Sequence, residues 1–83
     1  MCKKREVYAV ETGDYVGQML IVVEPTSDFV GCLCVPNMTN LKVPSDAFER
    51  GRNFNILTLV DKLPRSFFKT SVAQYKHNEN ISN

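Results

Sequence analysis

The residues best suited to metal or covalent chemistry are three cysteines and one histidine: Cys2, Cys32, Cys34 and His77. Thiolates and imidazole suit a tetrahedral zinc ion, but structural zinc sites usually pair cysteines with about two to four intervening residues. Cys32 and Cys34 are one residue apart, and the other two candidates lie near the chain ends. We therefore expect no metal and no other cofactor, with Cys32 and Cys34 acting as small buried hydrophobes.

Catalysis lacks a convincing set of residues. A nucleophilic cysteine needs a positioned base, and the sole histidine is His77, close to the end of the sequence. Glu11 and Asp14 are paired carboxylates beside a turn, where acids are common for conformational reasons. The segment Gly13–Gly17 matches no phosphate-binding loop. The sequence thus predicts a protein that is not an enzyme.

Basic and aromatic residues alternate in the second half of the chain. The candidate partner-binding residues there are Arg50, Arg52, Arg65, Phe67 and Lys69. Proteins that bind single-stranded nucleic acid combine cationic grooves with aromatic stacking platforms. However, the pI is about 7.7, whereas nucleic-acid-binding domains usually exceed about 9. Nucleic acid is therefore the alternative partner, and an unidentified protein is the leading one.

Length and composition indicate one globular domain. The 83 residues allow a single core, and the apolar content of 43% is near the globular average. Net charge is +1, with a mildly acidic first half and a mildly basic second half. This balance is typical of ordinary solvated faces and does not by itself identify a partner.

The sequence also predicts a cytoplasmic protein that does not enter a membrane. Its longest apolar run is Met19–Val23, far short of the roughly 20 residues of a membrane-spanning helix. The basic start is followed by Glu6 rather than by the apolar core of a signal peptide. An odd number of cysteines argues against a disulfide framework.

Strand-forming segments separated by turn residues dominate the rest of the sequence. β-Branched and aromatic residues favour strands, whereas Gly, Pro and Asp interrupt them. Ser45 is a good helix N-cap, Gly51 a good helix stop, and Phe48 between them should fill the core. The predicted strands are Glu6–Val10, Tyr15–Glu24, Phe29–Val35, Thr39–Val43, Phe54–Val60 and Ser66–Tyr75, with one short helical turn near 45–50.

Five to six short strands with one helical turn predict a mainly β fold. The expected form is a small antiparallel barrel or a strongly bent sheet, SH3-like or OB-like in strand count and order. Residues 6–76 form the expected domain. Residues 1–5 are expected to be loose, and the polar tail 77–83 to be flexible.

These patterns together favour a small stand-alone regulator or inhibitor that binds another protein. It would use an exposed strand edge or the face carrying Arg50, Arg52 and Arg65. Accessory proteins of phages and viruses fit this description. The alternatives are a nucleic-acid-binding small barrel and a structural subunit that assembles into a homo-oligomer.

Overall fold

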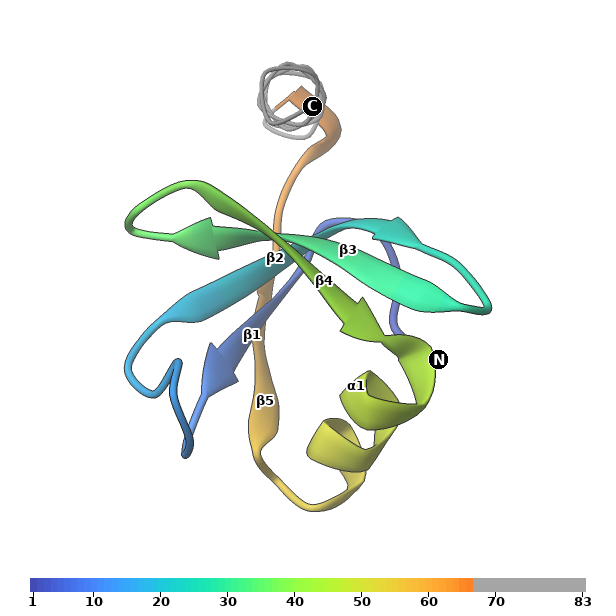
Figure 1. Ribbon diagram of the computed structural model, residues 1–83. Helices are drawn as coiled ribbons and strands as arrows, with labels where there is room; N and C mark the ends of the chain where they lie inside the picture. The colour runs from blue at the N-terminus through green and yellow to red at the C-terminus, as the bar shows by residue number, and fades with distance from the viewer. Residues whose placement is uncertain (67–83) are drawn as a thin grey trace.

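The computed structural model describes residues 1–66, which form five antiparallel strands and one helix (Figure 1). Apart from Ser66, the strand predicted over Ser66–Tyr75 lies outside the described residues. In chain order the elements are β1 (Glu6–Val10), β2 (Met19–Pro25), β3 (Phe29–Val35), β4 (Thr39–Pro44), α1 (Ser45–Asn53) and β5 (Leu57–Lys62). The prediction of a mainly β fold with one short helix is confirmed.

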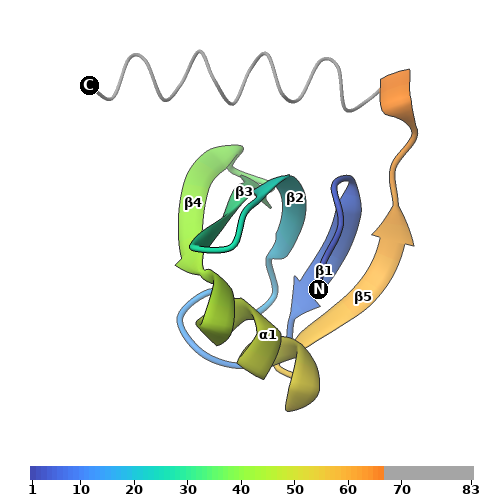
Figure 2. The ribbon, with the colours of Figure 1, turned by 90° about the vertical axis from the view of Figure 1, so that its right-hand side faces the viewer.

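The five strands form one sheet in the order β4-β3-β2-β1-β5. The first four are consecutive neighbours, and β5 returns to pair with β1. The sheet is not closed into a barrel, because β4 and β5 are its two edges. Of the two predicted forms, a small barrel or a strongly bent sheet, the closed barrel therefore needs correction. In Figure 2, α1 connects β4 to β5 at one end of the sheet, and it packs against both strands.

Most strand boundaries follow the sequence, but β2 begins later than predicted. β1 and β3 have the predicted bounds. Residues 15–18 belong instead to a loop, in which Gly13 and Gly17 adopt φ values of +93° and +85°. Those left-handed conformations cannot continue a strand. The chain therefore turns back before β2, and this loop becomes important for the candidate site.

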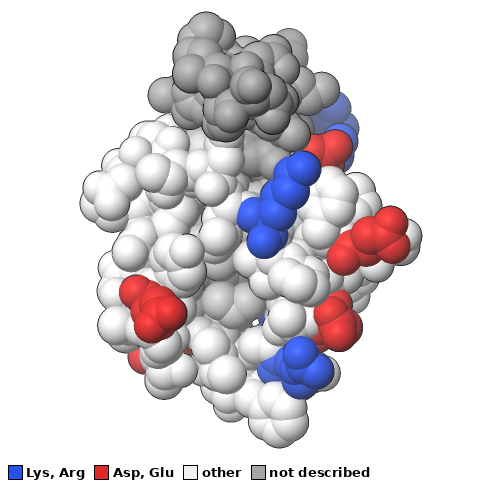
Figure 3. Space-filling model, viewed as in Figure 1, with Lys and Arg blue, Asp and Glu red and all other residues white. Residues whose placement is uncertain are grey.

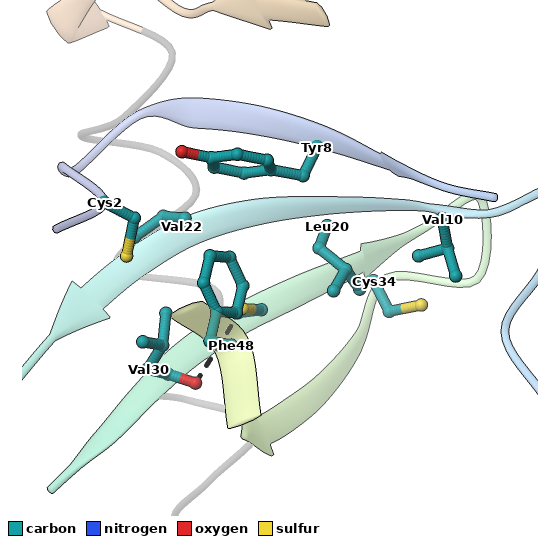
Figure 4. Packing of buried hydrophobic residues seen from close by; sticks show 9 residues of the cluster. Cys2, Tyr8, Val10, Leu20, Val22, Val30, Cys34 and Phe48 are labelled. Atoms are coloured by element: carbon teal, nitrogen blue, oxygen red, sulfur yellow. Dashed lines mark hydrogen bonds between the residues drawn. The ribbon is translucent and has the colours of Figure 1, made fainter. Parts of the chain in front are cut away.

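The main core lies between the inner face of the sheet and α1 (Figure 4). Phe48 projects from α1 and is fully buried, as predicted. Its ring meets the ring of Tyr8 edge to face, with centroids 5.2 Å apart. Leu41 and Val43 of β4 pack against the same cluster, also as predicted. The helix is thus fixed to the sheet by one aromatic anchor.

Cys2 belongs to this core as well. Its side chain is 3% exposed, and its backbone N–H donates to Glu49 Oε2 at 3.3 Å. The backbone N–H of Arg5 donates to the carbonyl of Val22 at 2.8 Å. These contacts hold the segment before β1 against β2 and α1.

A second apolar cluster occupies the other face of the central strands. It consists of Val7, Ile21, Val23 and Leu33, with Leu63 among the residues packed against it. Burial on both faces confirms the prediction that the apolar run in β2 is central. Such strands need apolar residues at successive positions, which explains the lack of alternation.

The helix differs from the predicted helical turn at both ends. Pro44 occupies the N-cap position, and the Ser45 hydroxyl donates instead to the carbonyl of Thr26 at 2.7 Å. Gly51 does not stop the helix, which continues to Asn53. A Cβ at Gly51 would lie 3.0 Å from Leu57 Cδ1, so the glycine permits close packing of α1 on β5. Both predicted caps were wrong because tertiary contacts use these residues.

The last described strand is more exposed than predicted. We expected a buried strand over Phe54–Val60, but β5 begins at Leu57, and Leu59 and Val60 are about half exposed. The strand lies at the sheet edge, where one side has no neighbouring strand among residues 1–66. Within residues 1–66, no helix has the length and apolar character to cross a membrane.

Candidate functional site

An apolar groove opens beside α1 and is the candidate site. Its volume is about 400 Å³. The floor includes Leu20, Leu41 and Leu57, which belong to the core or pack against it. Three exposed apolar side chains form its rim: Tyr15, Phe54 and Ile56. We call this feature the α1 groove; it joins the β1–β2 loop, β4 and the α1–β5 connection.

The β1–β2 loop contributes Tyr15, whose side chain is 43% exposed. Two backbone hydrogen bonds close the loop near its base. The Val10 N–H donates to the Gln18 carbonyl at 3.0 Å, and the Gly17 N–H donates to the Val10 carbonyl at 3.1 Å. Gly17 allows the positive φ that this closure requires. The position of Tyr15 is therefore set by backbone structure.

The α1–β5 connection contributes Phe54 and Ile56. Phe54 is the C-cap residue of α1, and its N–H donates to the Arg50 carbonyl at 3.0 Å. Asn55 adopts φ of +59°, a left-handed conformation that asparagine tolerates well. The Ile56 N–H then donates to the Gly51 carbonyl at 2.8 Å, and this turn leaves Phe54 71% exposed.

A single hydrogen bond connects the two sides of the rim. The Glu11 N–H donates to the carbonyl of Ile56 at 2.8 Å. It joins the start of the β1–β2 loop to the connection that carries Phe54. The rim is therefore a connected framework whose apolar side chains face solvent.

Charged residues of both signs line the α1 groove. Asp14 lies on the β1–β2 loop, and Arg50 lies on α1. Neither has an ion-pair partner among the described residues. Lys42 of β4 also lines the groove, and its ammonium lies 4.8 Å from the centroid of the Phe29 ring. An apolar floor with a few charges around it is typical of a binding site.

The structure separates the residues that the sequence grouped as a partner-binding face. Arg50 lines the α1 groove, whereas Arg52 lies over the Tyr8 ring, 5.7 Å from its centroid. The Arg52 guanidinium donates to Glu49 Oε1 at 2.7 Å, so its charge is already paired. Arg65 is exposed beyond the far end of β5. The remaining two candidates, Phe67 and Lys69, lie outside the described residues.

The surface around the α1 groove carries no concentrated charge. Figure 3 shows basic and acidic side chains scattered over this face, with uncharged surface between them. A protein that tracks a phosphate backbone normally gathers Lys and Arg along one groove. The described part of this face lacks such a concentration.

The three cysteines are free and buried. Burial raises the pKa of Cys32 to about 12, and it also raises the pKa values of Cys2 and Cys34. The Cys34 thiol donates to Gln18 Oε1 at 2.7 Å. Reactive cysteines need a lowered pKa and access to solvent, so these thiols behave as core residues. Residues 1–66 contain no group of three side chains that could hold a metal ion.

The edge strand β5 is a second place where a partner strand could pair. The register passes from Val7↔Asp61 to Tyr8↔Leu59, so Val60 bulges out of the ladder. Bulges and charged residues are features that protect sheet edges from pairing with other chains. With Val60 bulged and Asp61 and Lys62 exposed, this edge is a poorer site than the α1 groove.

Sequence reasoning missed the rim of the α1 groove. Tyr15 was assigned to a strand, and Phe54 and Ile56 to the start of another. The useful signal was the pair of asparagines, Asn53 and Asn55, around Phe54. Asparagine favours turns and left-handed backbone, so this pattern predicts an exposed loop better than a strand.

Comparisons with known proteins identified no relative: no family model, no curated protein and no solved structure matches the chain.

Proposed function

We propose that this protein is a small binding domain whose α1 groove takes up a short segment of a partner protein. The observation that carries the proposal is the group of three exposed apolar residues, Tyr15, Phe54 and Ile56, around an apolar floor. Scattered exposed hydrophobes are normal, but hydrophobes grouped around a groove are typical of interaction sites. Aromatic residues are also enriched at protein interfaces.

The rigidity of the rim supports the proposal. Binding costs free energy when side chains and loops must be ordered, and an ordered site reduces that cost. Here the backbone bonds of Val10, Gly17, Phe54 and Ile56 hold both sides of the rim. The volume of about 400 Å³ suits one or two side chains of a docked segment.

The finer fold class that we propose is SH3-like. Four consecutive strands are neighbours, followed by α1 and by the return of β5 to β1. An OB-fold is a Greek-key barrel, in which the strand order is not that of a simple meander. The resemblance is one of architecture and carries no function by itself.

Nucleic-acid binding is less well supported by the described residues. Arg52 is paired with Glu49, and Arg50 and Arg65 belong to different parts of the molecule. A complex driven by phosphate contacts weakens steeply as salt rises. An apolar interface does not, so salt dependence separates the two functions.

The test is selection of a phage-displayed random peptide library on the immobilised full chain. Synthetic copies of enriched peptides are then titrated against wild type and Phe54→Ala. Loss of a central aromatic contact typically costs about 2 kcal/mol or more, equivalent to roughly 30-fold weaker binding. We expect that loss for Phe54→Ala, with little change between low and high salt.

The matched control is Leu59→Ala, because Leu59 is an exposed apolar residue of β5 that does not line the α1 groove. It should retain binding within about twofold. Peptides that bind equally well to Phe54→Ala contradict the proposal. Tight, salt-sensitive binding of single-stranded oligonucleotides, with no enriched peptide, would favour the alternative.

A further inference from the structure

The geometry points to a specific ligand class for the α1 groove: a peptide segment with one apolar anchor, an acidic residue on one side and a basic residue on the other. This inference rests on the proposed function and adds the charge pattern of the partner. The acidic residue would face Arg50, and the basic residue would face Asp14.

The inference follows from the position of the two charges. Asp14 lies on the β1–β2 loop and Arg50 on α1, and both line the same groove. An exposed ion pair between them would cancel their fields, but the described residues form no such pair. Two separated, unpaired charges of opposite sign therefore remain beside an apolar floor. Complementary charges on a ligand would fix its direction in the groove.

On the positive side, Arg50 is the basic side chain that the argument uses. Lys42 also lines the groove, but its ammonium lies 4.8 Å from the centroid of the Phe29 ring, and Phe29 does not line the groove. The negative side includes Asp14, and Glu11 is exposed on the same loop. The groove thus has acidic residues on the β1–β2 loop and Arg50 on α1.

A charge-swapped protein provides the test. The random peptide library is panned on wild type and on the double variant Asp14→Arg/Arg50→Glu, each shown to be folded by circular dichroism. We expect wild type to enrich peptides in which an apolar residue stands between an acidic and a basic residue. The swapped variant should enrich the reversed order of charges. For a wild-type peptide, Arg50→Gln or Asp14→Asn alone should weaken binding about two- to fivefold.

The matched control swaps charges that do not line the groove, with Glu24→Lys/Arg65→Glu. This variant should enrich the same peptides as wild type. Peptides whose affinity depends on Phe54 but not on Asp14 or Arg50 would overturn the charge pattern and leave the proposed function intact. If no peptide is enriched, or if peptide affinity does not depend on Phe54, the proposed function and this inference both fail.

Discussion

Phe48 and Phe54 are six positions apart in sequence, and their side chains differ completely in exposure to solvent. Phe48 in α1 is fully buried against Tyr8, whereas Phe54 just after α1 is 71% exposed beside the groove. Phe48 fixes the helix to the sheet, and Phe54 exposes an apolar ring to solvent. The comparison shows that residue type alone does not separate stability from binding, because position relative to the helix end decides which role each ring has.

The two regions also differ in how their polar groups are satisfied. Around Phe48, the Tyr8 hydroxyl donates to Glu6 at 2.9 Å, and Arg52 is paired with Glu49. Around Phe54, Asp14 and Arg50 have no ion-pair partner among the described residues. A region with satisfied polar groups stabilises the fold, whereas unpaired charges remain available to a ligand.

Truncation of the buried ring should have the largest effect. We expect Phe48→Ala to lower the free energy of unfolding by about 3–5 kcal/mol, because it removes buried surface and leaves a cavity. Urea denaturation followed by circular dichroism measures the change. If the alanine variant does not fold, Phe48→Leu gives a milder loss of the same sign. A loss below about 1 kcal/mol for the alanine variant would contradict the stabilising role assigned to Phe48.

Alkaline pH should weaken the core. Burial raises the Cys32 pKa from 9.0 to about 12. Above about pH 9 the unfolded chain releases this proton and the folded chain retains it, so stability falls as pH rises. At about pH 10.5 the loss is on the order of 2 kcal/mol. Urea denaturation across this range tests it, and Cys32→Ala should reduce the pH dependence, with the remainder coming from other buried groups such as Cys2 and Cys34.

A substitution in the β1–β2 loop should have an intermediate effect. Gly17→Ala places a side chain where φ is +85°, at a cost of about 1–2 kcal/mol. No atom lies within 4 Å of the added Cβ, so the cost is conformational. Peptide binding should weaken as well, since the loop carries Tyr15. The control Val16→Ala changes an exposed residue and should leave unfolding unchanged; equal effects of both variants would contradict this account.

The smallest effect on stability should come from the exposed ring. Phe54→Ala should change the free energy of unfolding by no more than about 0.5 kcal/mol, because the side chain buries little surface. The same denaturation assay measures it beside Phe48→Ala. A loss comparable to that of Phe48→Ala would show that Phe54 supports the fold rather than binding.

The sequence predicted those parts of the fold that depend on local patterns. Strands β1 and β3 have the predicted bounds, and Phe48 fills the core as expected. Prediction from the sequence failed where one pattern of residues has two structural interpretations. The alternation from Phe54 onward suits a strand, but the helix extends past Gly51 and the strand begins only at Leu57. The candidate site was therefore only partly predictable: of its residues, Arg50 was named, and Tyr15, Phe54 and Ile56 were not.

Local patterns in the sequence were enough to predict that this chain forms short strands with buried apolar residues, because β-branched runs and turn residues act locally. The residue pattern also indicated that Cys32 and Cys34 are buried, whereas the burial of Cys2, in a segment expected to be loose, came from the structure. The open sheet, with β4 and β5 as its edges and α1 packed against both, depends on long-range pairing and was visible only in the folded structure. The same packing brought the β1–β2 loop beside the end of α1. Segments about forty residues apart in sequence meet there because strand pairing closes the long loop between them.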